Sequence, residues 1–240
     1  MKAENTEILI NGFGLFGIEI NEDQINVFSK YFDMLIEWNE KINLTAIVDE
    51  REAVIKHFVD SVSVIPFFPE NASSLIDVGT GAGFPGIPIK IVRNDINVTL
   101  LDSLEKRVRF LNAVIKETGL TGIDAFHGRA EDFGRDEKFR ERYDIGIARA
   151  VSSLPVLCEY VMPFVRVGGY FIAMKGANVM DELAESKKAV SVLGGEIEEV
   201  KNFTLPFDNL ERNVVLIKKL RQTPTGYPRK SGKPAKSPIK

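Results

Sequence analysis

The sequence predicts an α/β fold: a mostly parallel sheet of seven strands, an antiparallel hairpin at one edge, and an N-terminal helical extension. From residue 75 onward, short apolar runs alternate with segments of helical periodicity, which is typical of parallel strands joined by helices that cover both faces. Residues 1–70 show helical patterns only. A turn region at 206–212 alone separates the last two strands, so we expect these to pair antiparallel at the sheet edge.

The helical extension is predicted from caps and apolar periodicity. Asn21 followed by Gln24, and Asp49 followed by Glu52, each fit the capping-box pattern of a helix start. Behind each cap, apolar residues recur at intervals of three and four. The second of these helices should end before Pro66, because the residue preceding a proline disfavours helical backbone.

Seven strands and four helices are expected in the rest of the chain. The strands are predicted at residues 75–78, 98–101, 123–126, 143–148, 170–174, 197–205 and 213–218, and the helices near 84–93, 104–118, 153–165 and 178–193. The first of these helices is expected to begin near Phe84. Pro85 and Pro88 then fall in its first turn, where backbone N–H groups have no helical partner.

Composition limits the class of protein. The chain has 240 residues, 44% of them apolar and 27% charged, which suffices for one large domain and is ordinary for a soluble globular protein. The single cysteine, Cys158, excludes an intramolecular disulfide, and with only two histidines it cannot form an ordinary zinc site. The sequence contains neither an apolar run of about 18 residues nor a signal-peptide pattern. We therefore expect a cytoplasmic protein without a membrane span or a metal.

Charge divides the chain into an acidic body and a basic tail. Residues 222–240 hold five Lys or Arg and no acidic residue, so the net charge of −3 splits into +5 for the tail and −8 for residues 1–221. This pattern indicates a polyanionic partner for the tail, or else a solubilising disordered end. We predict three parts: a helical region at 1–70, an α/β domain at 71–221 and a flexible basic tail at 222–240.

The turn after the first strand carries the clearest functional signal. Residues 75–88 read L-I-D-V-G-T-G-A-G-F-P-G-I-P. Glycines let backbone N–H groups approach a ligand, and Gly79 and Gly81 are the expected contacts. The spacing is G-x-G-x-G, whereas dinucleotide folds show G-x-G-x-x-G. Asp77 would repel a pyrophosphate and attract a positive group, which favours the amino-acid end of S-adenosylmethionine; a tight turn of another α/β protein is the alternative.

Two further segments follow the next strands, at the carboxyl edge where open parallel sheets bind ligands. Asp102 lies 23 residues after Gly79, the position from which an acid accepts hydrogen bonds from ribose hydroxyls; the alternative is a helix N-cap. Ala130 and Glu131 follow the third strand. A backbone N–H and a carboxylate there can read N1 and the amine of adenine, and the alternative is a solvated charged loop.

Arg149 and Lys175 close the fourth and fifth strands and are the candidate catalytic residues. Arg149 is placed to hold the methionine carboxylate, a phosphate or the target base, with an ion pair as the alternative; Lys175 is a weaker candidate of the same kind.

His57 and Asp60 share one helix face and have no assigned role. Cys158 lies in an apolar helix stripe and is expected in the core. A general base is not evident, and guanine N7, whose lone pair is free at neutral pH, would need none.

Together these segments resemble one family. N-L-T at 43–45, H-F-V-D-S at 57–61, D-V-G-T-G-A-G-F-P-G-I-P at 77–88, L-L-D-S-L-E-K-R-V-R-F-L at 100–111, R-A-E at 129–131 and A-R-A at 148–150 match the RsmG (GidB) family of bacterial 16S rRNA guanine-N7 methyltransferases. The match covers nearly the whole chain. The resemblance implies a Rossmann-like class I S-adenosylmethionine-dependent methyltransferase fold.

The resemblance also implies an activity, the transfer of a methyl group from S-adenosylmethionine to N7 of guanine 527 in the 530 loop of 16S rRNA. It implies cofactor contacts by Gly79, Phe84, Ala130, Glu131 and Arg149. The expected partner is 16S rRNA or the small ribosomal subunit, met by a monomer. Two alternatives stay open: a methyltransferase of small molecules, and a non-catalytic RNA-binding protein that responds to S-adenosylmethionine.

Overall fold

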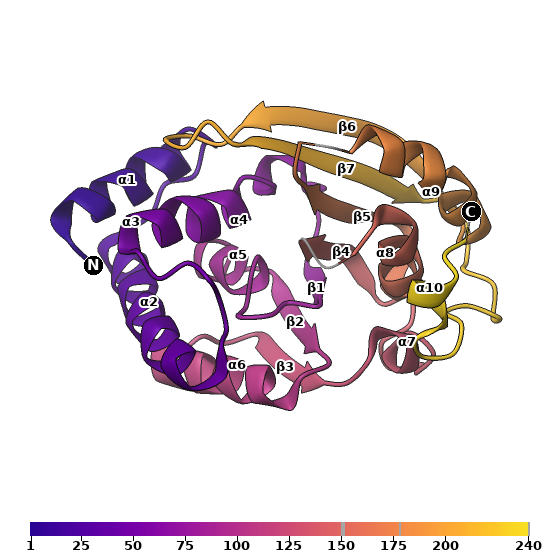
Figure 1. Cartoon of the computed structure of the whole chain (residues 1–240), viewed down its shortest axis with the longest axis horizontal. Coiled ribbons are helices and arrows are strands. Elements are labelled where there is room, and N and C mark those ends of the chain that lie inside the picture. The colour runs from indigo at the N-terminus through magenta and orange to yellow at the C-terminus, as the bar shows by residue number, and fades with distance from the viewer. Residues whose placement is uncertain (150–151, 178, 240) are drawn as a thin grey trace.

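The computed structural model describes residues 1–149, 152–177 and 179–239, and within them a seven-stranded sheet forms the centre of the molecule (Figure 1). Its strands lie in the order β3-β2-β1-β4-β5-β7-β6, with parallel pairs among β1 to β5 and antiparallel pairs on both sides of β7. The bounds are β1 Ser74–Val78, β2 Asn97–Asp102, β3 Ile123–His127, β4 Tyr143–Arg149, β5 Val165–Lys175, β6 Gly195–Thr204 and β7 Glu211–Lys219. The predicted parallel sheet with an antiparallel edge hairpin is confirmed. Ala150, Asn178 and Lys240, which belong to predicted motifs or segments, lie outside the described residues.

Helices cover both faces of the sheet, because alternate residues of each strand point to opposite sides. On one face, α5 (Gly86–Val92) and α6 (Glu105–Thr118) pack with the N-terminal helices over Leu75 and Leu100. On the other face, α8 (Leu154–Val161), the 3₁₀ turn η3 (Met162–Phe164) and α9 (Met180–Val192) pack over Ile76 and Leu101. The short helix α7 (Ala130–Phe133) borders this second layer.

The N-terminal helices share the first of these two cores with the sheet. They are α1 (Ala3–Gly14), α2 (Glu22–Ile42), α3 (Glu50–Ala53), the π-helix η1 (Val54–Val59), α4 (Asp60–Val62) and the 3₁₀ turn η2 (Ile65–Phe67). The capping box of Asn21 and Gln24 is present in both directions. Tyr31 packs its ring against Phe58 and against Phe110 of α6. Residues 1–70 therefore add a layer to the sheet and have no separate core.

The helix after β1 begins later than the sequence predicts. α5 begins at Gly86 and Pro85 takes the N-cap position, so Phe84 lies in the preceding turn. The backbone N–H of Phe84 donates to the carbonyl of Thr80 at 3.0 Å, and the N–H of Gly86 donates to the Asp77 carboxylate at 2.9 Å. These two bonds extend the glycine turn as far as Pro85 and delay the start of the helix.

The basic tail is folded against the body, whereas the sequence predicts a flexible segment. It runs beside α7 and α8 and includes the short helix α10 (Lys233–Lys236) (Figure 1). The guanidinium of Arg229 binds the fully buried carboxylate of Glu159 on α8, through Nε at 2.9 Å and Nη2 at 2.5 Å. A buried carboxylate is costly unless a cation is bonded to it. The tail supplies that cation, and the spacing of the two residues in the sequence cannot indicate this.

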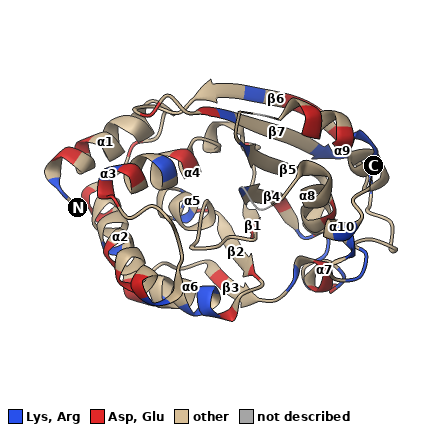
Figure 2. Ribbon diagram, viewed as in Figure 1, with Lys and Arg blue, Asp and Glu red and all other residues tan. Residues whose placement is uncertain are grey.

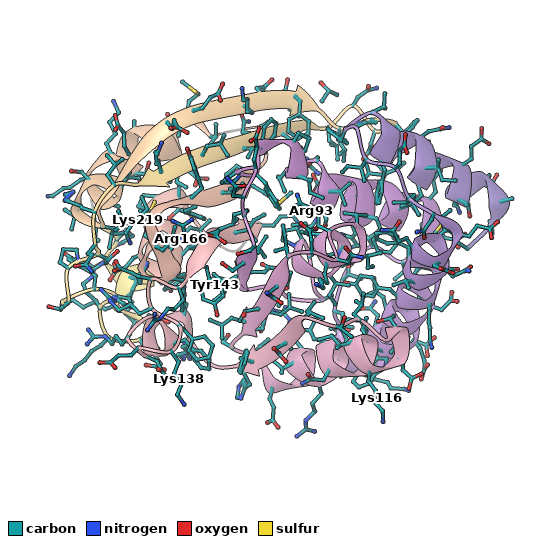
Figure 3. The ribbon with its side chains drawn as sticks, turned by 180° about the vertical axis from the view of Figure 1, so that it is seen from behind. Arg93, Lys116, Lys138, Tyr143, Arg166 and Lys219 are labelled. Carbon is teal, nitrogen blue, oxygen red and sulfur yellow. The ribbon has the colours of Figure 1, made fainter. Side chains whose placement is uncertain are left out.

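One carboxylate ties together the amino edge of the sheet. Asp144 of β4 accepts hydrogen bonds from the backbone of Ser73 and Ser74 and pairs with Arg166 of β5 at 2.6 Å (Arg166 is labelled in Figure 3). Burial acts to raise the pKa of Asp144, but the bonds from Ser73, Arg166 and Ser74 outweigh it and lower the pKa to about 2. This cluster joins β1, β4 and β5 at the end of the sheet opposite the glycine turn.

Candidate active site

The glycine turn leaves open space above Gly81. Gly79, Gly81 and Gly83 have positive φ angles of 75°, 63° and 102°, which L side chains rarely adopt. A Cβ atom at Gly83 would lie 2.5 Å from Ile87 and 2.7 Å from the Tyr31 hydroxyl, so packing requires this glycine. A Cβ atom at Gly81 would meet no atom of the described residues within 4 Å. Gly81 therefore presents bare backbone toward open space.

Asp77 lies beneath the turn and holds it. Its carboxylate is fully buried, and Oδ2 accepts hydrogen bonds from the hydroxyl of Thr80 at 2.6 Å and from the backbone of Gly86 at 2.9 Å. Burial raises the pKa of Asp77 to about 6, against the lowering effect of these two bonds. Oδ1 is buried without a hydrogen-bond partner among the described residues. The observed role of Asp77 is thus to shape the turn, with one oxygen left unpaired.

Asp102 also binds the turn. Its Oδ2 accepts from the backbone N–H of Gly81 at 2.9 Å, and its Oδ1 accepts from the N–H of Leu104 at 2.9 Å, at the start of α6. Arg107 of α6 pairs with it at 3.4 Å. The carboxylate joins the end of β2 to the glycine turn. The helix-capping alternative is not met, because Leu104 takes the N-cap position of α6 and no side chain caps that helix. A carboxylate offers about four acceptor positions, so these bonds leave capacity for a ligand.

A cavity of about 110 Å³ opens on one side of Gly79, beside the end of β2. It brings together Ala130 and Glu131, as the sequence predicts, and adds Tyr160 of α8, which the sequence analysis does not single out. Tyr160 belongs to a helix read only as apolar packing, and its position depends on how α8 meets α7. Glu131 is 4% exposed, and its Oε1 accepts from the backbone N–H of Gly232 in the tail at 2.8 Å.

A second cavity, of about 380 Å³, lies on the other side of Gly79. Its walls include Gly81, Phe84, Arg107, Arg149, Leu44 and His57. Leu44 and Thr45 come from the segment between α2 and α3, which the sequence analysis names only as part of the family resemblance. Oδ1 of Asn39 accepts from the backbone of both residues, at 2.6 and 2.8 Å, and so fixes this segment at the cavity wall.

His57, Phe84 and Arg149 stack on one another at this wall. The His57 and Phe84 rings lie 4.3 Å apart at 19°, and the guanidinium carbon of Arg149 lies 5.1 Å from the Phe84 ring centre. Nδ1 of His57 is 3.4 Å from Nη2 of Arg149, and Nε2 is 2.9 Å from the hydroxyl of Thr45. Burial, followed by the charge of Arg149, lowers the pKa of His57 to about 3. The imidazole is therefore neutral at pH 7, with both nitrogens engaged.

A third cavity, of about 360 Å³, shares His57 and Arg149 with the second. Asp60 joins two arginines at its wall: Oδ2 accepts from Nη1 of Arg149 at 3.0 Å, and Oδ1 accepts from Nε of Arg212 at 2.7 Å. Arg212 belongs to β7, and the sequence analysis misses it because only the sheet order brings it next to Asp60. His57 and Asp60, left without a role by the sequence, thus lie at the centre of the site.

Lys175 lines the third cavity with its charge already compensated. It is 8% exposed, and its ammonium donates to the carbonyl of Ser152 at 2.6 Å and pairs with Glu182 at 2.7 Å. Arg149 likewise makes the ion pair that the sequence analysis allows as its alternative, with Asp60. Both predicted residues therefore face one cavity from the ends of adjacent strands.

The cysteine lies outside these cavities. Cys158 is fully buried in the second core, and burial raises the pKa of its thiol far above the ordinary range. Across the described parts of the chain, the acidic, histidine and cysteine side chains form no cluster able to hold a metal ion. None of the helices within residues 1–149, 152–177 and 179–239 is long and apolar enough to cross a membrane.

The three cavities follow one another along the carboxyl edge of the sheet. Gly79 lines the first and second, and His57 and Arg149 line the second and third. A ligand lying across Gly79 would reach Glu131 at one end and the stack of His57, Phe84 and Arg149 at the other. The third cavity then offers room for a second molecule beside the stack.

The amino-acid sequence is similar to those of known proteins. The family GidB, described as rRNA small subunit methyltransferase G, matches residues 24–215. Curated proteins named ribosomal RNA small subunit methyltransferase G include one from Acetivibrio thermocellus, 57% identical over 97% of this chain and 96% of that protein. Another, from Alkaliphilus oremlandii, is 51% identical over 99% of this chain and 100% of that protein.

The fold is also similar to solved structures. A crystal structure of S-adenosylmethionine-dependent methyltransferases from Methanosarcina mazei matches with a TM-score of 0.52 and 14% identity, over 66% of this chain and 98% of that chain. YcgJ from Bacillus subtilis matches with a TM-score of 0.52 and 13% identity, over 69% of this chain and 100% of that chain. Such low identity concerns the fold alone, and the predicted Rossmann-like class I methyltransferase fold is confirmed.

Proposed function

We propose, from the premise that this chain belongs to the rRNA small subunit methyltransferase G family, that it methylates N7 of guanine 527 in the 530 loop of 16S rRNA. Membership of the family makes the chain an enzyme that uses S-adenosylmethionine and acts on small-subunit rRNA. Beyond family membership, we propose which nitrogen and which nucleotide are methylated, and which residues bring the two substrates together.

The first two cavities fit S-adenosylmethionine. The open space above Gly81, which a Cβ atom would enter, suits a ligand that approaches the backbone of the turn. We assign Ala130 and Glu131 to the adenine, Asp102 to the ribose, and Gly79 and Phe84 to the middle of the ligand. The unpaired Oδ1 of Asp77 and the cation of Arg149 suit the ammonium and the carboxylate of the methionine. When bound, the cofactor supplies a methyl group on a positively charged sulfur.

The third cavity is assigned to the target nucleotide. Arg149, Arg212 and Lys175 bring cations to its wall, which suits the phosphate and the O6 atom of a guanine nucleotide. His57 lines both the second and the third cavity and stacks on Phe84 of the second, so this flat stack lies where the two substrates would meet. The target base must leave its stacked position to enter. Alignment of two reactants contributes up to roughly 7–11 kcal/mol to catalysis.

The state of His57 is the observation that carries the choice of N7. Its pKa of about 3 keeps it neutral, and both ring nitrogens are engaged by Thr45 and Arg149, so it is not free to accept a proton from a substrate. Arg149 and Lys175 are cations held in ion pairs. Guanine N7 has a free lone pair at neutral pH and needs no base, whereas an amine or hydroxyl acceptor must lose a proton.

The test combines methyl-labelled S-adenosylmethionine with small subunits or naked 16S rRNA that lack the modification, followed by cleavage at N7-methylguanine. We expect the label at N7 of guanine 527. Label on an exocyclic amine or at another nucleotide would contradict the proposal. Activity on free metabolites alone would favour a small-molecule methyltransferase, and binding of both ligands without turnover would favour a non-catalytic RNA-binding protein.

Arg149→Gln provides the matching test of the site. It should lower both turnover and cofactor affinity, because it removes a cation shared by the second and third cavities. Lys188→Gln, an exposed change on the outer helix α9, is the control for a loss of charge alone. Full activity and full cofactor affinity in Arg149→Gln would remove Arg149 from the site.

The folded tail supplies a basic surface for RNA beside the first cavity. Figure 2 shows Lys and Arg residues gathered on the segment next to α7 and α8. Lys230, Lys233 and Lys236 are exposed there, whereas the charge of Arg229 is compensated by Glu159. Phosphate contacts from these lysines would position the rRNA without reading its sequence. One chain supplies every group assigned here, so we propose that the monomer is the active unit.

A further inference from the structure

The tail reaches the cofactor site itself. We call residues 222–239 the strap, because they run from the end of β7 past α8 to α7 (Figure 1). The backbone N–H of Gly232 in the strap donates to Oε1 of Glu131 at 2.8 Å, and Glu131 lines the cavity of about 110 Å³. Within the part of the chain that the structure describes, Oε2 of Glu131 has no hydrogen-bond partner. That oxygen is left for a ligand.

The body binds the strap before the strap reaches Glu131. The buried ammonium of Lys219, labelled in Figure 3, donates to the hydroxyl of Thr223 at 2.6 Å. From the loop between α7 and β4, Nη1 of Arg140 donates to the carbonyl of Tyr227 at 2.9 Å, and Nε of Arg135 donates to that of Pro228 at 2.8 Å. Side chains of the body thus fix the path of the strap backbone.

The ion pair of Arg229 and Glu159 fixes the strap next to the cavity. The backbone N–H of Arg229 donates to Glu159 at 2.7 Å, and its guanidinium binds both carboxylate oxygens. Such bidentate pairs restrict geometry as well as adding energy. Glu159 precedes Tyr160, which faces Glu131 across the cavity. Gly232 follows Arg229 by three residues, so its N–H is held near the Glu131 carboxylate.

We propose that the strap is a positioning element of the cofactor site, in which Gly232 orients the Glu131 carboxylate so that Oε2 is available to the adenosine part of S-adenosylmethionine. The proposal rests on the assignment of Glu131 to the cofactor, made above. Because one oxygen is already bound, the carboxylate loses little freedom when the cofactor binds. Linkage then requires cofactor binding to stabilise the docked strap by the same factor by which the strap strengthens cofactor binding.

Calorimetric titration with S-adenosylhomocysteine, without RNA, tests the proposal. Gly232 has a φ of 79°, and a Cβ atom there would meet no described atom within 4 Å, so Gly232→Val strains the turn without a clash. Gly232→Asn, the conservative variant at the same position, should keep the affinity of the unmodified chain, because Asn tolerates this backbone region. Gly226→Val is the matched control in the same strap, with neither a positive φ nor a neighbour within 4 Å in the described chain. We expect Kd to rise about tenfold in Gly232→Val and to stay within about twofold in the other two variants.

A double-mutant cycle with Glu131→Gln separates positioning from a general loss of stability. If the strap acts through Glu131, Gly232→Val should have less than about a twofold effect in the Glu131→Gln background. Equal effects in both backgrounds, or an unchanged Kd in Gly232→Val, would overturn the proposal.

Hydrogen exchange gives a reading on the unmodified chain. S-adenosylhomocysteine should slow exchange of the Gly232 amide about tenfold, as linkage requires. Unchanged exchange at saturating ligand would overturn the proposal. Neither measurement contains RNA, so neither outcome depends on which nucleotide is methylated.

Discussion

Asp77 and His57 should make the free energy of unfolding depend on pH in opposite directions. The two effects should nearly cancel in the unmodified chain. Burial raises the pKa of Asp77 from 3.8 to about 6, and burial followed by the charge of Arg149 lowers that of His57 from 6.5 to about 3. Between pH 3.8 and 6, the folded chain keeps an Asp77 proton that the unfolded chain loses, so stability falls as pH rises. Between pH 3 and 6.5, the unfolded chain binds a His57 proton that the folded chain does not, so stability rises with pH.

The magnitudes follow from these pKa values. From pH 4 to pH 6, linkage lowers the free energy of unfolding by about 2 kcal/mol through Asp77 and raises it by about 2.5 kcal/mol through His57. The two contributions together raise it by only about 0.5 kcal/mol. Asp77→Asn removes the first contribution and should leave a rise of about 2.5 kcal/mol in the free energy of unfolding. His57→Gln removes the second and should leave a fall of about 2 kcal/mol.

Urea unfolding followed by circular dichroism at pH 4, 5 and 6 measures these profiles, provided that the dependence on urea concentration is equal in all variants. Glu40→Gln, an exposed change on α2, is the control and should follow the unmodified chain. An Asp77→Asn profile as flat as that of the unmodified chain would refute the reasoning. A His57→Gln profile that rises with pH would refute it equally.

Asp60→Asn should lower the free energy of unfolding by about 3 kcal/mol, since Arg149 and Arg212 lose the carboxylate that they share; a change below about 1 kcal/mol in urea would contradict this. Tyr31→Phe should lower it by about 1 kcal/mol, because the Ala82 carbonyl in the glycine turn loses its donor, and calorimetry should show weaker cofactor binding. Replacing Lys230, Lys233 and Lys236 together by Gln should reduce the slope of log affinity for rRNA against log salt by about 2–3, with Lys188→Gln as the control. An unchanged slope would place these lysines away from the RNA.

The glycine turn was predictable because its determinants are local. Its positive φ angles follow from glycines within five residues of one another, directly after an apolar strand. The structure changes the interpretation of Asp77, whose observed bonds hold Thr80 and Gly86, and of Phe84, which lies before the helix. The sequence assigned these residues to the correct segment, but their individual contacts depend on the exact path of the turn.

The folded tail was not predictable from its composition. A segment rich in Lys, Pro and Gly satisfies the usual criteria for disorder. It folds because Glu159, 70 residues earlier in the chain, is buried and binds Arg229, and because Arg135 and Arg140 bind its carbonyls. The one available signal was Glu159, an acidic residue within a mostly apolar helix segment, and it does not identify its partner.

The sequence by itself determined the succession of the seven strands along the chain, the position of the glycine turn and the family, because apolar periodicity and motifs act over a few neighbouring residues. The short helices α7 and α10 were not predicted. Only the tertiary structure decided how Asp60 meets Arg149 and Arg212, which lie 89 and 152 residues away, and how the strap meets Glu131, 101 residues away. The physical reason is that buried charges select partners by proximity in space, and proximity here is set by the order of the strands and by the layer of N-terminal helices.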